Sequence, residues 1–294
     1  NNPLWRGQYG DYVNDNINTS NRFAVTATFL KDFSFEISGS ANINTNNTSN
    51  FSPTRTDLDW ENRVILQDAL NTLTNSYSIF YRLQNENILR YQKQLGDHKI
   101  SALAGYSAIY DRNDGFNGSL QGFPSDALQE FNAGGVVNPA VNGSADEVSL
   151  QSFFGRVNYN FNEKYLFEAN IRRDGSSRFG ENNRYGVFPA FSAAWRISAE
   201  SFMASATWLD DLKIRGGWGQ MGNSNNVNPD NQYSLFGGDV GASSYDISGT
   251  NSSAVIGFRR SRLGNPDGKW ETSVTKNIGF DGTAFGGKLD FIVD

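Results

Sequence analysis

The sequence has no cysteine, a single histidine and only two methionines and seven prolines among its 294 residues. Without cysteine the chain can form no disulfide, no thiolate nucleophile and no cysteine-ligated zinc or iron–sulfur site. Because His98 is the single imidazole, a metal site built from several histidines is excluded within the chain. Charged residues make up 19% of the chain and leave a net charge of −6, so no nucleic-acid partner held by clustered Lys and Arg is expected.

Long apolar runs are also missing. No stretch of 18 or more apolar residues is present, which excludes a transmembrane helix. The first residues, Asn1 to Trp5, lack the basic and apolar regions of a signal peptide. The chain begins without Met and ends inside an expected strand at 288–294, so we expect it to be a segment of a longer protein.

Aromatic residues are abundant. The 22 Phe, 12 Tyr and 6 Trp make up 14% of the chain. This apolar area argues against a disordered chain. The length is sufficient for one large domain or two medium ones.

Apolar and polar residues alternate along most of the chain, which is the period of a β-strand whose two faces meet different surroundings. In 153–161 and again in 165–171, the odd positions are mostly Phe, Tyr, Val, Ala and Ile, and polar residues fill the row between them. Helical spacing occurs only from Trp60 to Leu73, where it allows a short helix in a loop. We expect about ten strands, at 23–29, 33–43, 77–94, 99–110, 153–161, 165–171, 185–197, 212–218, 269–284 and 288–294.

Tight and long connections alternate between these strands. The tight ones lie at 31–32, 95–98, 162–164 and 285–288, and a moderately short one lies near 198–207. The long polar ones lie near 46–74, 111–147 and 221–268, with a shorter polar one at 174–184. Up-and-down strands then place all long connections at one end, which is typical of outer-membrane barrels with short periplasmic turns and long extracellular loops. A soluble β-sandwich also alternates, but it has no reason to sort its loops in this way.

We therefore predict an all-β fold, a transmembrane antiparallel β-barrel. Residues 1–294 would form part of one barrel domain, with long extracellular loops near 46–74, 111–147 and 221–268. Because an open sheet is not viable in a membrane, about ten strands would be an arc of a larger cylinder. Barrels of 22 strands with a plugged lumen are known as transporters.

The distribution of charge supports this prediction. A Lys or Arg that faces lipid at mid-bilayer costs about 2–4 kcal/mol, and the apolar rows of 153–161, 185–197 and 212–218 contain neither. Lys276 interrupts one apolar row, and a bulge or a strand that projects beyond the membrane would accommodate it. The opposite rows suit a watery or plugged lumen, because they hold Arg156, Glu168, Arg172, Arg184 and Arg196.

Two glycine-rich motifs suggest nucleotide binding, but their context does not support it. The G-x-G-x-x-G pattern at 217–222 follows an expected strand, yet no helix is expected after it to hold a pyrophosphate. The segment 282–288 resembles a phosphate-binding loop, but Leu289 stands where Ser or Thr would bind magnesium. A tight hairpin turn explains these glycines better.

The sequence contains no constellation typical of an enzyme. His98 lies in an expected turn, and no G-x-S-x-G elbow presents a serine. Asp210 and Asp211 would point to opposite faces of a strand, so they do not form a glycosidase pair. The segment 111–115 does not match the spacing of an EF-hand loop. We predict no enzymatic activity and no catalytic, cofactor or metal site.

Several long runs in fixed order resemble a known family. They are LQSFFGRVNYNF at 150–161, KYLFEANIRRDGSSRF at 164–179, YGVFPAFSAAWRIS at 185–198, LKIRGGWGQMGN at 212–223 and NPDGKWE at 265–271. These runs resemble the barrel of SusC/RagA-type TonB-dependent outer-membrane transporters. The resemblance covers most of 148–294 and, less closely, 19–110.

The resemblance implies a 22-stranded barrel with an internal plug in the outer membrane of a Gram-negative bacterium. It implies import of a large nutrient, an oligosaccharide or a peptide, together with a SusD-like surface lipoprotein. The TonB–ExbB–ExbD system would supply energy through a plug and TonB box that this chain lacks. The segment alone would neither close nor transport. The alternative is a surface-displayed, β-rich carbohydrate-binding or adhesin module.

The residues that contact substrate are not identified by any motif. Ligand contacts would come from the long loops and from lumen-facing aromatic residues. Phe116, Phe123, Tyr233 and Tyr245 could stack on sugars. The alternative is that these aromatic residues pack on one another.

Overall fold

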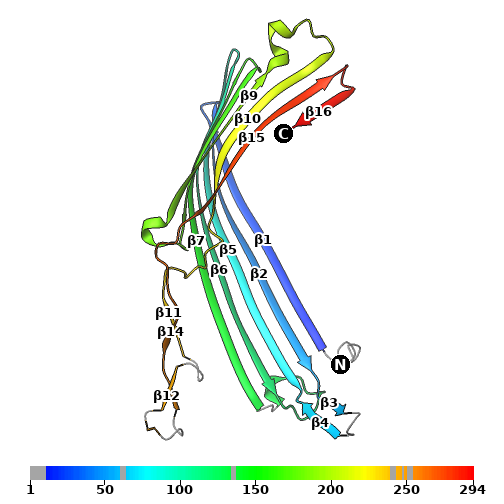
Figure 1. Cartoon of the computed structure of the whole chain (residues 1–294), viewed down its shortest axis with the longest axis vertical. Helices are drawn as coiled ribbons and strands as arrows, with labels where there is room; N and C mark the ends of the chain where they lie inside the picture. The colour runs from blue at the N-terminus through cyan, green and yellow to red at the C-terminus, as the bar shows by residue number, and fades with distance from the viewer. Residues whose placement is uncertain (1–10, 60–63, 134–136, 239–242, 247, 250–253) are drawn as a thin grey trace. The chain divides into compact units, whose positions relative to one another are not determined.

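The computed structural model describes residues 11–59, 64–133, 137–238, 243–246, 248–249 and 254–294, which form β-strands and short 3-10 helices (Figure 1). The strands are β1 (Asp11–Phe29), β2 (Phe33–Ser52), β3 (Arg55–Asp59), β4 (Val64–Ala69), β5 (Thr72–Leu95), β6 (His98–Gln121), β7 (Val137–Phe161), β8 (Tyr165–Ser176), β9 (Tyr185–Arg196), β10 (Leu209–Asn223), β11 (Leu235–Gly237), β12 (Ser244–Asp246), β13 (Ala254–Ile256), β14 (Arg259–Arg262), β15 (Glu271–Ala284) and β16 (Leu289–Val293). The 3-10 helices are η1 (Phe131–Ala133), η2 (Glu181–Asn183), η3 (Ile197–Ala199) and η4 (Ser201–Met203). Within these ranges, no helix could cross a lipid bilayer.

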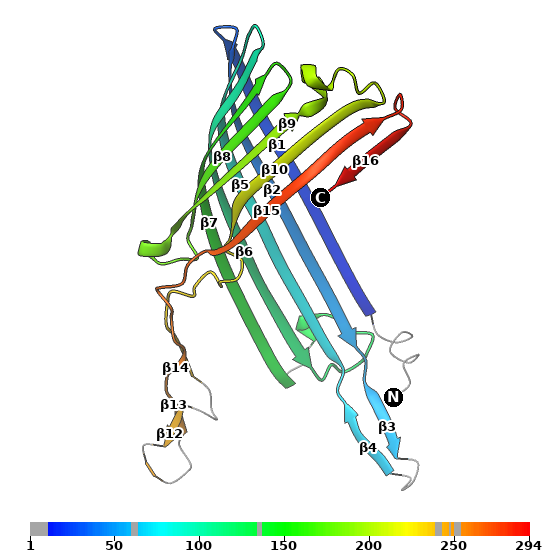
Figure 2. The ribbon, with the colours of Figure 1, turned by 45° about the horizontal axis from the view of Figure 1, so that its top comes forward.

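Ten strands form one sheet in the order β1-β2-β5-β6-β7-β8-β9-β10-β15-β16 (Figures 1 and 2). The pairs from β7 to β16 along this order are antiparallel. The other six strands form three small two-stranded sheets, β3–β4, β11–β14 and β12–β13. The expected ten strands, each beside its predecessor in the main series, are thus confirmed.

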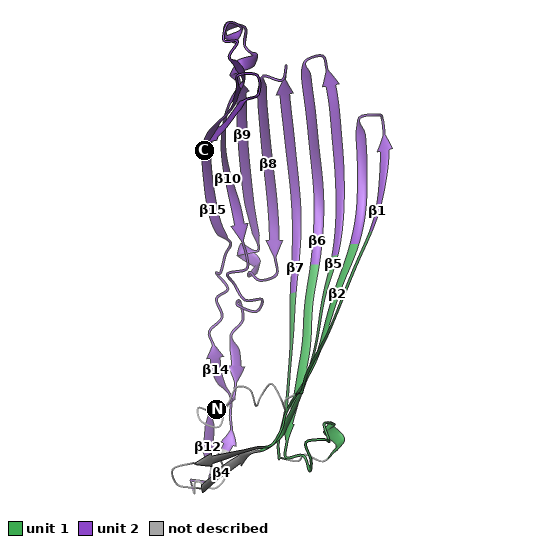
Figure 3. Cartoon of the chain, turned by 90° about the vertical axis from the view of Figure 1, so that its right-hand side faces the viewer, with its two compact units in different colours: residues 1–22, 40–83, 110–147 green, residues 23–39, 84–109, 148–294 purple. Residues whose placement is uncertain are grey.

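The described chain divides into two compact units (Figure 3). Unit 1 comprises residues 1–22, 40–83 and 110–147, and unit 2 comprises residues 23–39, 84–109 and 148–294. The packing, faces and sites are described below within one unit at a time.

The tight turns lie where the sequence predicted them. Between β7 and β8, Asn162 and Glu163 adopt φ values of 52° and 55°, and the amide of Lys164 donates to the carbonyl of Phe161 at 3.0 Å. Two consecutive residues with positive φ give the turn twist that matches the twist of paired strands. Short connections also join β1 to β2, β5 to β6 and β15 to β16.

The strands of unit 1 extend into stretches where long loops were expected. β2 continues to Ser52 and β6 to Gln121, while β7 begins at Val137. Polar side chains pair across these strands, as the 2.8 Å hydrogen bond from Ser49 to Asn75 illustrates. A ladder needs no apolar face, because its backbone hydrogen bonds do not depend on side chains. The Asn- and Ser-rich composition therefore indicated loops where the chain forms strands.

The short helix expected within 60–73 is wrong. β3 and β4 form an antiparallel hairpin in which Asp59 pairs with Val64, and β5 begins at Thr72. Residues 60–63 lie outside the described residues. A short apolar run cannot be assigned to helix or strand from its spacing alone, which explains the error.

A cluster of aromatic rings and glycines joins the connections of unit 2. The ring of Trp270 lies 5.2 Å from that of Phe179 and 5.4 Å from that of Phe188, measured between centroids. The Trp270 indole Nε1 donates to the carbonyl of Arg184 at 3.1 Å. A Cβ at Gly222 would lie 2.0 Å from a Phe188 ring atom, so β10 needs glycine there. The cluster holds β9 and β10 against the residue that precedes β15.

We expect Gly222→Ala in the full-length protein to lower stability by about 1–3 kcal/mol, because the methyl group overpacks the Phe188 ring. The measurement is the urea concentration at the midpoint of unfolding, with the folded fraction monitored by heat-modifiable gel mobility. Gly39→Ala is the matched control, since the nearest atom to its Cβ would be 3.9 Å away. Equal midpoints for the two variants would contradict the packing described.

Candidate functional site

One face of the unit 2 strands is apolar and uncovered; we call it the apolar face. Phe167, Phe191 and Trp195 on this face are 51%, 54% and 38% exposed. Cross-strand pairing extends the face over further exposed side chains, which are Phe153, Val157, Ile171, Val187, Val274, Ile278 and Phe280. Within the described residues, no second sheet packs on them. A contiguous apolar surface of this extent marks an interaction with a membrane or another apolar partner.

The opposite face of the same strands is polar; we call it the polar face. The expected Arg156, Glu168, Arg172 and Arg196 lie on it, because their cross-strand partners belong to the polar rows. Arg184 lies outside the strands, directly after η2. Further polar-face residues are Asn158, Asn160, Asn170, Ser192, Lys213, Arg215, Asn277 and Asp281.

Ion pairs connect the strands across the polar face. Asp281 on β15 accepts hydrogen bonds from Lys213 at 2.8 Å and from Arg215 at 3.0 Å, and both come from β10. Arg215 also contacts Asp294 at 2.7 Å. The sequence did not predict this network, because alternation assigns each residue to a row but does not fix the register between strands.

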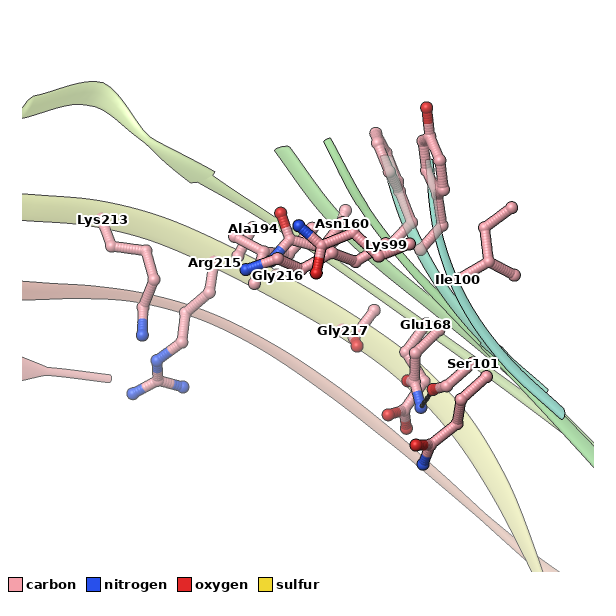
Figure 4. Close-up of a pocket in the computed structure, with 18 of the residues that line it drawn as sticks. Lys99, Ile100, Ser101, Asn160, Glu168, Ala194, Lys213, Arg215, Gly216 and Gly217 are labelled. Carbon is pink, nitrogen blue, oxygen red and sulfur yellow. Dashed lines mark hydrogen bonds between the residues drawn. The ribbon is translucent and has the colours of Figure 1, made fainter. Parts of the chain in front are cut away.

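A hollow of about 800 Å³ lies over the polar face. The side chains of Lys213 and Arg215 extend from β10 to the same side of the sheet (Figure 4). Amide, ammonium, guanidinium and carboxylate groups line the hollow, so it can donate and accept hydrogen bonds. Polar residues from seven strands contribute, namely Gln92, Lys93, Gln94, Lys99, Ser101, Asn158, Asn160, Glu168, Ser192, Lys213, Arg215 and Asn277. Among the described residues, no three His, Cys, Asp or Glu gather as metal ligands would.

Three of the four candidate substrate contacts are exposed. Phe116 on β6 is 58% exposed, and its ring lies 6.1 Å from that of Tyr77. Tyr233, in the β10–β11 connection, and Tyr245, on β12, are also exposed. Phe116 belongs to unit 1 and the two tyrosines belong to unit 2, so the structure defines no single site that they share.

Phe123, the fourth candidate, is buried in unit 1. It packs with Phe51 and Leu73, and the ring centroids of Phe51 and Phe123 lie 6.0 Å apart. The Asn71 side chain clamps its backbone, because Nδ2 donates to the Phe123 carbonyl at 3.0 Å and Oδ1 accepts from the Phe123 amide at 2.7 Å. Burial of Phe123 could not be inferred from its polar surroundings in the sequence.

Asp126 extends this clamp within unit 1. Its Oδ1 accepts from Asn71 Nδ2 at 2.9 Å and from the amide of Thr54 at 3.1 Å. Burial by itself would raise the pKa of Asp126, but these donors outweigh burial and hold the pKa below its ordinary value. The charged carboxylate therefore fixes the β6–β7 connection near physiological pH.

A family model described as TonB-dependent receptor-like, beta-barrel matches residues 1–294. This chain belongs to that family. It is 32% identical to TonB-dependent receptor P39 of Formosa agariphila over 100% of this chain and 27% of that protein. It is also 32% identical to TonB-dependent receptor SusC of Bacteroides thetaiotaomicron over 73% of this chain and 20% of SusC. The chain thus spans about a quarter of the length of these relatives.

Solved structures of the RagAB peptide transporter share the fold of this TonB-dependent receptor-like segment. One matches with a TM-score of 0.82 and 24% identity, over 98% of this chain and 30% of that one. The RagAB peptide importer in its open-open state matches equally well. Together with the SusC relative, these matches confirm the SusC/RagA resemblance and the barrel fold.

The barrel family explains the two faces of unit 2. In a transmembrane barrel, each strand presents one row to hydrocarbon and the other to the lumen. The apolar face of this TonB-dependent receptor-like segment is the lipid side, and the polar face with its hollow is the lumen side. Lys276 lies on the lipid side, because it pairs with Trp218 on β10.

Glu200 anchors the edge of the apolar face, a role that its place in a short connection did not reveal. Tyr165 Oη donates to Glu200 Oε1 at 2.7 Å and Trp195 Nε1 donates to the same oxygen at 3.1 Å. Lys164 Nζ contacts Oε2 at 3.1 Å. The tyrosine hydroxyl, followed by the indole and the ammonium, lowers the pKa of Glu200. Aromatic rings with one polar end suit the membrane interface.

Because the pKa of Glu200 is lower in the folded state, its charge stabilises the fold above the unfolded pKa and this stabilisation is lost as pH falls through the folded pKa. We expect Glu200→Gln to lower the urea midpoint of the full-length protein at pH 7. The difference from the wild type should shrink as the pH falls through the lowered pKa of Glu200, because the wild-type side chain then becomes protonated and neutral like glutamine. Asp267→Asn, in an exposed loop, is the control, and an unchanged midpoint for Glu200→Gln at pH 7 would contradict the anchor.

Proposed function

We propose that the full-length protein imports a large nutrient, an oligosaccharide or a peptide, across the outer membrane of a Gram-negative bacterium. The observation that carries the proposal is the opposition of an uncovered apolar face and a hollowed polar face on one set of barrel strands. A polar lumen suits a hydrophilic cargo that passes through the barrel or a plug that fills it. Membership of the TonB-dependent receptor-like family supports the same conclusion.

Energy would come from TonB–ExbB–ExbD through a plug region that lies outside this chain. A SusD-like lipoprotein would act at the extracellular side, where we place the stretches 46–74, 111–147 and 221–268, which contain strand extensions and small two-stranded sheets as well as loops. Support comes from a relative named TonB-dependent receptor SusC and from the RagAB peptide transporter and importer structures. The proposed partners rest on this similarity alone. The barrel is supported independently by the apolar and polar faces of the sheet.

The chemistry of the lumen side favours a polar cargo without strong net charge. Each cation that lines the hollow has an acidic partner: Lys93 pairs with Asp32 and Lys99 with Glu163. Lys213 and Arg215 pair with Asp281, and Arg215 also with Asp294, so the hollow has no large field of one sign. Exposed rings such as those of Phe116, Tyr233 and Tyr245 would supply stacking surfaces for sugars. These three stay candidate contacts, and Phe123 has no exposed ring face to offer.

The test is deletion of the full-length gene, followed by growth and uptake on a panel of glycans and peptides. We expect loss of growth on one cargo class, restored by the wild-type gene but not by a gene that lacks the plug. The expressed protein should require detergent for extraction and show heat-modifiable gel mobility. A protein that stays monomeric in plain buffer would overturn the proposal in favour of a surface carbohydrate-binding or adhesin module.

A further inference from the structure

A groove crosses the apolar face of unit 2 between two pairs of stacked aromatic rings. Phe191 and Trp218 form one wall, with ring centroids 6.0 Å apart. Tyr159 and Phe167 form the other wall, with centroids 6.5 Å apart. The space between them is about 510 Å³.

Small residues form the floor of this groove, which we call the small-residue groove. Ala193 pairs with Phe167 on one side and with Gly216 on the other, and Ala169 pairs with Phe191. A Cβ at Gly216 would meet nothing closer than 3.7 Å. Glycine at this position is therefore not required by packing, and it leaves open a space that a side chain would fill.

Lys276 is the cross-strand neighbour of Trp218, which forms part of one wall of the small-residue groove. The Trp218–Lys276 pair lies two residues along the strands from the Gly216–Ile278 pair, so Lys276 is on the same face as Gly216. Within the described part of the chain, no carboxylate forms an ion pair with Lys276. On the apolar face of β7 to β10 and β15, Lys276 and Arg173 are the only cations. An unpaired lysine at mid-bilayer would cost about 2–4 kcal/mol.

The position of Lys276 along β15 places it at the lipid headgroups instead. Strands rise about 3.3 Å per residue, and barrel strands tilt by about 40°. From Lys276 to the end of β15 at Ala284, the chain therefore descends roughly 20 Å toward the tight turn. Tight turns are periplasmic and the apolar band is about 25 Å tall. Lys276 thus lies near the outer-leaflet boundary, where phosphate groups occur.

We propose that the small-residue groove and Lys276 form a binding site for one phosphate-bearing lipid of the outer leaflet. An acyl chain fills the groove between the two ring pairs, and the phosphate accepts a hydrogen bond from the Lys276 ammonium. Charge complementarity accounts for a lysine on the lipid side, and the acyl chain accounts for glycine and alanine on the floor. The proposal rests on the membrane placement given under the proposed function.

The test uses the purified full-length protein in detergent, titrated with monophosphoryl lipid A and followed by native mass spectrometry. We expect Lys276→Gln to weaken binding about fivefold, which corresponds to the value of one lysine near a charged lipid surface. Gly216→Leu should abolish the specific adduct, because its side chain fills the groove. The same lipid without its phosphate should bind the wild type as weakly as it binds Lys276→Gln.

Two variants are controls. Lys288→Gln removes a lysine from the tight turn, and Gly39→Leu adds a leucine to another strand of the same face, where nothing lies within 3.9 Å of its Cβ. Equal lipid binding by Gly216→Leu and Gly39→Leu would overturn the site, as would equal binding of monophosphoryl lipid A and the same lipid without its phosphate. Heat-modifiable mobility verifies that each variant folds. Because binding is measured without uptake, a failed uptake assay would refute the import function and leave this result unaffected.

Discussion

The structure depends on one constraint: each strand must separate hydrocarbon from a polar interior through a wall one strand thick. Backbone groups inside a bilayer cannot bond to water, so neighbouring strands must satisfy them. Side chains then point alternately to the two media, with a period of two residues. This explains why buried apolar residues are few and why Phe167 and Phe191 are exposed. The free energy that a globular protein gains from a core is gained here from transfer of one face into lipid.

The same constraint explains where specific packing is concentrated. Along the middle of the strands, the apolar face needs only apolar side chains and no specific packing. At the ends of the strands, the chain must turn between media, and there the structure uses defined contacts. At one end of β9, Glu200 accepts hydrogen bonds from Tyr165 and Trp195. Near the other end, the rings of Phe188 and Trp270 pack together, and Phe188 lies against Gly222. The connections are therefore held by residues that the alternating pattern does not specify.

Period-two alternation was enough to predict ten antiparallel strands, their tight turns and the division into an apolar and a polar face. Glu168 and Arg196 could be assigned to the polar face because each lies between apolar neighbours in its strand. The extension of β6 to Gln121 could not be predicted, since polar residues and glycine predominate there and only Phe116 and Leu120 interrupt them. Burial of Phe123 depends on a distant clamp, Asn71, and the pairing of Asp281 with Lys213 depends on strand register. Such contacts follow from three-dimensional proximity, which a single sequence does not encode in a readable pattern.

The similarity to SusC and RagAB and the exposure of the apolar side chains lead to the same assignment of the apolar face. Family membership assigns the chain to a barrel, and the uncovered rings show which row meets the lipid. Lys276 is the departure from a purely apolar row, and its place near the headgroup boundary removes the conflict with the cost of a charge in hydrocarbon. The two faces of the sheet thus explain the alternation of apolar and polar residues, and the membrane boundary explains Lys276.

The central claim is that the apolar face contacts hydrocarbon. This chain has no cysteine. Once any cysteine elsewhere in the full-length protein has been replaced, single cysteines can be introduced at each position from Tyr165 to Arg172 and spin-labelled in lipid bilayers. The measurement is the accessibility of each label to oxygen, which partitions into lipid, and to a water-soluble nickel chelate. The account predicts high oxygen accessibility at 165, 167, 169 and 171, and low accessibility at the even positions. Equal accessibility at odd and even positions, or nickel accessibility at Phe167, would contradict it.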